Sequence, residues 1–153
     1  MIQYTIINSP IGNLLLAQSN KGLNHIIFEY QIPDFKSIIL KKITNENLVE
    51  DNKSLTNVII QLDQYFKGKR KSFELKLDLT LPPFYSKALM AVRNIPYGQY
   101  STYKEIAIRA GSPKAVRAAG SANACNPIPI IIPCHRVLAS DGRLGGYAGG
   151  LKI

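Results

Sequence analysis

The sequence has few cysteines and no long apolar run, and these absences exclude several classes of protein. Its 153 residues contain only Cys125 and Cys134, too few for the disulfide framework of a small secreted domain. The N-terminus shows no charged and then apolar leader, so we expect a reducing compartment, the cytoplasm with its nucleoid or, in a eukaryote, the nucleus. The longest apolar run, residues 127–134 when its prolines are counted, is far too short to cross a bilayer, and no membrane partner is expected.

Acidic residues are also scarce, mainly in the second half of the chain. The net charge is +9; residues 1–86 hold ten Lys or Arg against eight Asp or Glu (+2), and residues 87–153 hold nine against two (+7). A concentrated basic region favours binding to the phosphate backbone of a nucleic acid, because cations there release condensed counterions. Solubility alone is the other explanation of a basic chain. The 46% of hydrophobic residues suffices for one compact domain or two small ones.

The first part of the chain predicts a small antiparallel sheet followed by a helix. Turn residues at 9–13 separate β-rich segments at 2–7 and 14–17, and a third strand is expected over 23–30. Apolar residues then recur at helical spacing before Gly68, namely Leu55, Val58, Ile59, Leu62 and Phe66. Two prolines farther on mark a boundary, which predicts one domain over residues 1–80 and a second over residues 81–153.

Two helices joined by a glycine predict a helix-turn-helix in the second domain. Thr102 and Glu105 form a capping box that opens the first helix. Gly111 ends it, and Ser112, followed by a proline suited to a first turn, caps a second helix that runs toward Ala124. This pair of helices is typical of DNA-binding proteins.

The second of these helices has an unusual surface of small residues. Arg117 is the only long side chain in its middle, and the other surface residues are Ala115, Val116, Ala118, Ala119, Ser121 and Ala122. Helices that read the major groove carry several long polar side chains. Small residues instead suit close approach to the minor groove, although an alanine-rich helix buried in a core has the same composition.

Residues 130–137 predict a reactive thiol. An apolar, strand-like segment delivers Cys134 beside His135 and Arg136. A cysteine becomes a strong nucleophile when a neighbouring base or cation stabilises its thiolate, and these two neighbours are placed to do that. A buried cysteine that ends a core strand is the other explanation of the pair alone.

The motifs stand in the order and spacing of a known family. Pro-Cys-His-Arg-Val stands at 133–137. The motifs that accompany it are Ile-Pro-Tyr-Gly at 95–98, Thr-Tyr-Lys-Glu-Ile-Ala at 102–107, Ser-Pro-Lys-Ala-Val-Arg-Ala-Ala-Gly at 112–120, Asn-Pro at 126–127 and a glycine-rich run at 141–151. Each motif alone is weak. Together they make the chain resemble the O6-alkylguanine-DNA alkyltransferases over residues 83–151, whereas the first half is similar only in pattern.

The resemblance implies an α+β protein with a ribonuclease-H-like N-terminal α/β domain and a C-terminal winged helix-turn-helix domain. Residues 141–150 would form the wing. The implied function is direct-reversal DNA repair by a monomer, which binds double-stranded DNA through the minor groove and flips O6-alkylguanine out of it. The alkyl group passes irreversibly to Cys134, once per molecule. No cofactor is implied, and although some family members bind zinc in the first domain, that region here offers His25 and no cysteine.

The resemblance also assigns roles to single residues. His135 would act through a water as the base that produces the thiolate of Cys134, while Asn126 would brace the turn before it. Arg117 would fill the space of the extruded nucleotide, and Tyr103 would press on the rotated phosphate and reach the flipped base. Other DNA contacts would come from Ser112, Lys114, Ala118 and Gly120, and the base pocket from Val137, Tyr147, Ala148 and Gly149.

The sequence departs from the family pattern at two places. Leu89 replaces a usual aromatic residue, which should affect packing rather than chemistry. The family also continues into a helix whose glutamate orients the histidine, whereas this sequence ends at Ile153. A truncated chain, a substitute carboxylate from Asp141 or Glu105, or an unassisted His135 would each account for the difference.

Two other functions fit parts of the pattern. A DNA-damage binding protein with weak or no transfer would resemble the alkyltransferase-like proteins, but those lack the reactive cysteine that is present here as Cys134. A Cys-His hydrolase of amides would need an acid or amide partner and would not need a basic winged helix. Cys125 matches no family function, and we expect it to be a small packing residue.

Overall fold

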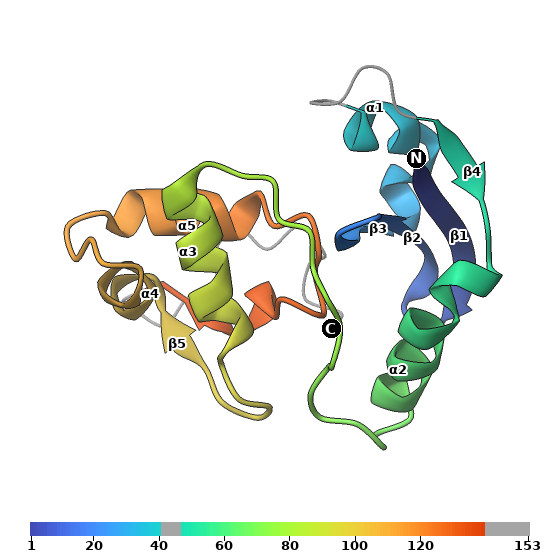
Figure 1. Cartoon of the computed structure of the whole chain (residues 1–153). Coiled ribbons are helices and arrows are strands. Elements are labelled where there is room, and N and C mark those ends of the chain that lie inside the picture. Colours follow the sequence, from blue (N-terminus) through green and yellow to red (C-terminus); the bar gives the residue numbers. More distant parts are fainter. Residues whose placement is uncertain (41–46, 140–153) are drawn as a thin grey trace. The chain divides into compact units, whose positions relative to one another are not determined.

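The protein consists of two compact units, shown in a computed structural model that describes residues 1–40 and 47–139 (Figure 1). The first unit is Met1–Asp78, and the second begins at Leu79. The first contains a four-stranded sheet with helices, and the second is mainly helical. No helix within the described residues is long and apolar enough to cross a membrane.

The sheet of the first unit is mixed. Strands β1 (Ile2–Ser9), β2 (Gly12–Ser19) and β3 (Gly22–Phe28) form an antiparallel meander, and β4 (Leu48–Glu50) pairs in parallel with β1. The strand order is β3-β2-β1-β4. The predicted antiparallel sheet is therefore right for its three strands, and the parallel fourth strand was not predicted. The chain reaches β4 after helix α1 (Phe35–Ile39), and a crossover connection of this kind delivers a parallel strand.

The central strand β2 is buried on both faces of the sheet. Its apolar residues Leu14, Leu15, Leu16 and Ala17 are all inaccessible to solvent. Alternate residues of a strand point to opposite faces, and Leu15 and Ala17 pack in one cluster with Ile39 of α1. Burial on both sides explains why a continuous apolar run, rather than an alternating pattern, marks this strand in the sequence.

Helix α2 (Thr56–Phe66) confirms the predicted helical spacing and holds the chain that follows it. The helix buries Val58 and Leu62. It also buries Gln61, whose Nε2 donates to the main-chain oxygen of Glu74 at 3.2 Å and whose Oε1 accepts from the main-chain nitrogen of Glu74 at 2.9 Å. This pair of bonds ties the returning chain to the helix.

The returning chain lies along the outer edge of β3. The Leu23 N–H donates to the Lys76 oxygen at 2.9 Å, and the Asp78 N–H donates to the Leu23 oxygen at 2.8 Å. Leu77 forms a single parallel bridge with Leu23. Gly22 permits this approach, because a Cβ there would lie 2.5 Å from the Lys76 oxygen.

Three helices form the core of the second unit. Helices α3 (Pro83–Arg93), α4 (Tyr103–Arg109) and α5 (Val116–Ala124) pack on one another, and a small parallel sheet pairs β5 (Ser101–Thr102) with β6 (Val137–Leu138). The buried residues of the three helices include Ala88, Leu89, Val92, Ile106, Ala107, Ala119 and Ala122. Many of these residues are alanines, so the helix backbones can approach closely.

Helices α4 and α5 form the predicted helix-turn-helix. At the start of α4 the Thr102 half of the predicted capping box is confirmed, whereas the Glu105 carboxylate accepts from the Ser101 hydroxyl. Thr102 caps the helix, because its Oγ1 accepts from the Glu105 N–H at 3.2 Å. Gly111, with φ of +88°, ends the helix in the left-handed region. Gly111 and the next residue donate their N–H groups to the Ile108 and Ala107 oxygens, which satisfies the last carbonyls of the helix.

Helix α5 begins later than predicted. The residue before it is Ala115, and no side chain caps its first turn. Ser112 instead belongs to a tight turn, since its carbonyl accepts from the Ala115 N–H at 2.9 Å. The predicted Ser112 cap is therefore wrong, because the chain closes a turn over Pro113 before the helix starts. The predicted wing, residues 141–150, lies outside the described residues.

Candidate active site

The segment that leads to Cys134 is a series of tight turns. The Ile132 N–H donates to the Ile128 oxygen at 3.0 Å, and Cys134 itself begins a 3-10 turn, η3 (Cys134–Arg136). The predicted strand is wrong here, because three prolines among residues 127–133 lack the N–H groups that a ladder requires. The thiol is therefore carried by a turn that is fixed by its own hydrogen bonds and by packing.

Ile130 occupies the most constrained point of this segment. Its φ is +75°, a conformation that a β-branched residue rarely adopts. The side chain is fully buried, as are its neighbours Ile128 and Ile132. Such a conformation persists only when the surrounding structure imposes it, so the apolar core holds the backbone that precedes Cys134.

Asn126 links the end of α5 to the turn that carries the cysteine. Its Nδ2 donates to the Ile132 oxygen at 2.8 Å, and its Oδ1 accepts from the Ile128 N–H at 2.9 Å. One carboxamide thus spans the segment between the helix and Cys134. Both of its polar atoms are used in doing so.

Asn123 is a second amide at the site, and it was not predicted from the sequence. It lies near the end of α5, is buried, and donates from Nδ2 to the Cys134 oxygen at 3.2 Å. The available signal was its helical spacing from Ala119, which places a polar side chain on the buried face of a small-residue helix. A buried amide in that position calls for a partner.

Arg136 contacts the chain that follows α3. Its Nη1 donates to the Ile95 oxygen at 2.9 Å, and its guanidinium carbon lies 5.4 Å from the centre of the Tyr97 ring. The expectation that Arg136 stabilises the thiolate stays a prediction. The guanidinium attaches the active-site turn to the chain that follows α3.

Burial determines the protonation states of Cys134 and His135. Burial raises the pKa of the Cys134 thiol to about 11, although hydrogen bonds from Asn126 and from the main chain act in the opposite direction. Burial, with a smaller effect of the Arg136 charge, lowers the pKa of His135 to about 4. At neutral pH the site therefore holds a thiol and a neutral imidazole. The neutral imidazole is in the form that can accept a proton.

The residues predicted to contact DNA lie on α4, on α5 and on the turn between them. Arg117 is exposed, as are Ser112 and Lys114 in the turn. Tyr103, at the start of α4, faces Gly120 of α5, where a Cβ would lie 4.0 Å from the tyrosine ring. Its hydroxyl is buried and has no hydrogen-bond partner in the part of the chain that the structure describes. Ala118 and Gly120 are both half-buried.

Part of the predicted base pocket can be placed. Val137 is buried in β6, two residues after the predicted base His135, whereas Tyr147, Ala148 and Gly149 lie outside the described residues, as does the alternative carboxylate of Asp141. The other alternative, Glu105, accepts a hydrogen bond from the Ser101 hydroxyl at 2.9 Å. Its carboxylate is therefore engaged at the start of α4.

Cys125 differs from the expectation of a packing residue, because it is exposed at the end of α5. Both cysteines carry free thiols. Within residues 1–40 and 47–139, no three His, Cys, Asp or Glu side chains are grouped as a metal site would require.

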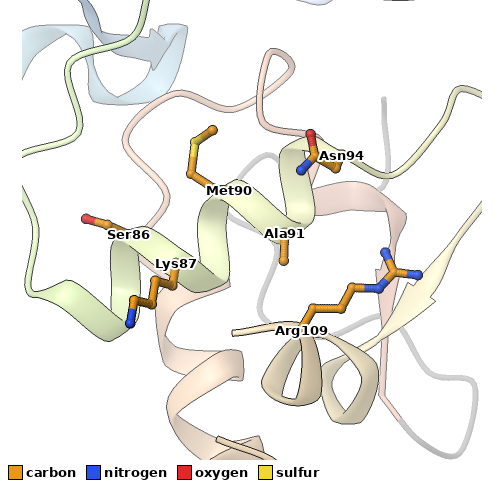
Figure 2. A pocket seen from close by; sticks show the side chains of 6 residues that line it. All are labelled: Ser86, Lys87, Met90, Ala91, Asn94 and Arg109. Atoms are coloured by element: carbon orange, nitrogen blue, oxygen red, sulfur yellow. The ribbon is translucent and has the colours of Figure 1, made fainter. Parts of the chain in front are cut away.

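An open pocket of about 400 Å³ lies between α3 and the end of α4, and Figure 2 shows the side chains that line it. These residues are Ser86, Lys87, Met90, Ala91, Asn94 and Arg109. The lining includes two cationic side chains, Lys87 and Arg109, and no cysteine. None of the predicted site residues lines this pocket, and neither does the reactive cysteine.

The fold and the site define a protein of two units in which a buried cysteine follows a helix-turn-helix. Residues 2–79 match the model of the 6-O-methylguanine DNA methyltransferase ribonuclease-like domain, and residues 83–153 match that of the DNA binding domain of the same enzyme. The chain belongs to the 6-O-methylguanine DNA methyltransferase family.

Relatives are similar over nearly the whole chain. The methylated-DNA--protein-cysteine methyltransferase of Methanosarcina barkeri is 47% identical over 98% of this chain and 90% of its own length. The constitutive enzyme of Bacillus subtilis is 37% identical over 97% and 88%. Among solved structures, Mycobacterium tuberculosis OGT in complex with DNA is 37% identical, with a TM-score of 0.80 over 96% of this chain and 84% of that chain.

Proposed function

We propose that this protein repairs DNA by direct reversal, as a methylated-DNA--protein-cysteine methyltransferase that acts once per molecule. The observation that carries the proposal is the buried Cys134 with a neutral His135 beside it, on a turn tied to the end of a helix-turn-helix. Relatives at 37–47% identity bear the same activity in their names. The first domain, residues 1–80, serves as a scaffold, and residues 81–153 carry the chemistry.

The reaction is a displacement at the alkyl carbon. Cys134 loses its proton through a water to His135, and the sulfur attacks the alkyl carbon in line with the bond to guanine O6. That bond breaks, its electron pair leaves with the guanine, and the guanine takes up a proton. The product on the protein is a thioether, which has no leaving group that water displaces readily, so the cysteine is consumed.

The buried position of Cys134 requires that the substrate base leave the duplex. We place the small-residue surface of α5 in the minor groove of double-stranded DNA, with Arg117 in the space of the extruded nucleotide. Tyr103 reaches the rotated base, and Ser112, Lys114, Ala118 and Gly120 contact the backbone. The charge of +7 on residues 87–153 supports this assignment, because it is concentrated in the same domain.

The base pocket is completed by Val137 with Tyr147, Ala148 and Gly149, and Asn126 holds the cysteine turn in position. The protein acts as a monomer without a cofactor, in the compartment that contains DNA. A damage-binding function without transfer is less well supported, since the reactive cysteine is present together with a histidine able to accept its proton.

The proposal is tested by mixing the protein with excess duplex DNA that contains O6-methylguanine labelled in its methyl group. We expect one label per protein molecule, on a peptide that contains Cys134, and an unmodified guanine in the DNA. Binding without labelled protein would indicate a damage binder. Release of the label over many turnovers would indicate a hydrolase, and label on Cys125 would contradict the assigned nucleophile.

A further inference from the structure

The open pocket between α3 and the end of α4 is lined by two positive charges (Figure 2). They belong to Lys87 and Arg109, and both side chains are exposed. Neither forms a salt bridge with any group in residues 1–40 or 47–139. The described part of the second unit contains one carboxylate side chain, Glu105, which accepts from the Ser101 hydroxyl at 2.9 Å. The positive charge of the pocket is therefore available to a ligand.

A pocket of the first unit shows the contrasting case. It has a volume of about 380 Å³ and is lined by residues of the β1–β2 hairpin and of α2. Its lining includes Lys67 and Asp63, whose side chains form a salt bridge at 2.9 Å. An acid one helical turn away thus neutralises the cation there. The six described residues that line the pocket at α3 include no acid, so an acidic partner would complement it.

The same pocket exposes an apolar side chain. Met90 is 39% exposed, whereas the other aliphatic residues of α3 are buried, namely Ala88, Leu89, Ala91 and Val92. Methionine adapts its shape to a partner and is enriched, with arginine, in protein interfaces. A phosphate backbone would pair with the two cations but would offer little apolar surface to Met90. The combination of charge and apolar surface therefore favours a peptide over a nucleic acid.

Two polar side chains of the lining can bind the main chain of a peptide. The Asn94 side chain is exposed and forms no hydrogen bond within the described part of the chain. Its carboxamide has a donor and an acceptor, which match the two groups of a peptide bond. The Ser86 hydroxyl donates to the Leu81 oxygen at 3.3 Å, and its own oxygen can still accept. Residues 86, 90 and 94 are spaced by four and share one face of α3.

We propose that the pocket between α3 and the end of α4 binds an acidic peptide segment of a partner protein. An apolar side chain of the segment packs against Met90 and Ala91, and the carboxylates on either side of it pair with Lys87 and Arg109. A guanidinium can bind a carboxylate through two parallel hydrogen bonds, which fixes the direction of the segment. None of the residues predicted to contact DNA lines the pocket, so we expect peptide and duplex DNA to bind at the same time.

The test uses the whole protein and short fluorescent peptides. In each peptide two acidic residues stand on either side of a central Leu, Met or Phe, and binding is measured by fluorescence anisotropy. We expect at least one of the three peptides to bind. Replacing its central residue by Ala, or its acidic residues by Lys, should weaken binding by about 10-fold or more. Lys87→Glu, Arg109→Glu and Met90→Ser should each weaken binding to a similar extent.

Two control variants lie in the same unit but outside the pocket lining. Lys104→Glu makes the same change of charge as Arg109→Glu, on the same helix. Ile108→Ser removes an apolar side chain that is 50% exposed, as a match for Met90→Ser. Neither control should change the affinity for the peptide by more than about twofold. A melting temperature equal to that of the wild type shows that a variant is folded.

Three results would overturn the inference. The first is that none of the three peptides binds the wild type, a result that does not depend on how any variant folds. The second is an equal loss of affinity in the pocket variants and in their controls, which would mean that the attraction is not specific to the pocket. The third is displacement of the bound peptide by duplex DNA, because the pocket would then belong to the DNA-binding surface.

Discussion

The two units of the protein differ in whether their buried polar side chains have hydrogen-bond partners. In the first unit Thr5, Asn24 and Gln61 are buried, and each has a hydrogen-bond partner within that unit. In the second unit the buried Tyr103 hydroxyl and Asn123 Oδ1 have none among the described residues. These groups of the first unit are thus paired within it, whereas these two atoms of the second unit have no partner in the part of it that the structure describes.

The distribution of charge follows the same division. Residues 1–86 carry +2 and residues 87–153 carry +7. A unit that leaves buried groups unsatisfied and concentrates positive charge is less stable on its own than its packing alone would allow. The following variants test how the two units differ.

The largest expected effect is a loss of transfer activity, and it distinguishes Cys134 from Cys125. Cys134→Ala should abolish transfer and leave affinity for DNA nearly unchanged, because the thiol supplies the chemistry and the helices supply the binding. Cys125→Ala is the matched control and should transfer at the wild-type rate. Intact-mass measurement after reaction and a binding titration with methylated duplex check both variants. Transfer by Cys134→Ala would refute the assigned nucleophile.

The next effect separates DNA binding from chemistry. Arg117→Ala should slow repair of duplex DNA by about 100-fold, because holding a base outside the stack costs a few kcal/mol. Reaction with free O6-benzylguanine should change little, because no base has to be extruded. The two rates are compared on the same preparation. Equal losses on both substrates would mean that Arg117 supports the fold or the pocket.

Low pH should lower the stability of both units, because each contains a histidine whose pKa is lowered by burial. Burial lowers the pKa of His25 to about 4, opposed by the charge of Asp78, and that of His135 to about 4. The unfolded chain therefore binds protons first as the pH falls below about 6.5, and stability is lost progressively until about pH 4. For His25 the loss amounts to about 3 kcal/mol at most, from 1.36 kcal/mol for each unit of pKa.

Urea unfolding at pH 7 and pH 5 measures this loss, and His25→Gln should reduce the difference between the two pH values. The same variant should leave the pH dependence of transfer unchanged, because His135 sets it in the second unit. Transfer should fall as the pH approaches 4, where His135 becomes charged and no longer accepts the thiol proton. A shifted transfer profile in His25→Gln would show that the units do not divide as described.

The smallest effect concerns the scaffold alone. Gln61→Leu leaves the main-chain N–H of Glu74 without its partner and should lower the free energy of unfolding by about 2 kcal/mol. Asn57→Ala removes only the bond from Gln61 Nε2 to the Asn57 side chain and should cost less than about 0.5 kcal/mol. Transfer per folded molecule should match the wild type in both variants, which is checked by titrating active sites.

Local signals predicted much of this fold. The Thr102 cap and Gly111 delimit α4 as expected, and the apolar spacing of α2 gives its buried face, because these features depend on neighbours within one turn of the chain. The parallel pairing of β4 was not predictable in this way, since it depends on a strand more than forty residues away. The Ser112 cap failed because a turn over Pro113 competes with helix initiation at the same residues.

The sequence identified the reactive pair at the site but not its environment. Cys134 and His135 are adjacent in the chain, so their proximity needs no folding. The partners of Arg136 and Asn123 are supplied by residues 41 and 11 positions away. Periodicity reveals that Asn123 shares a face with alanines, but only the folded backbone brings the Cys134 carbonyl to it.

The chain that leaves the first unit also covers the open side of its sheet. Lys76 and Asp78 occupy hydrogen-bonding groups of Leu23 on the outer edge of β3. An uncovered edge strand is a template for pairing with other molecules and for aggregation. A fragment that ends before residue 75 should therefore self-associate through β3, whereas one that extends through Asp78 should resist it. The connection between the units thus also protects the sheet against intermolecular pairing.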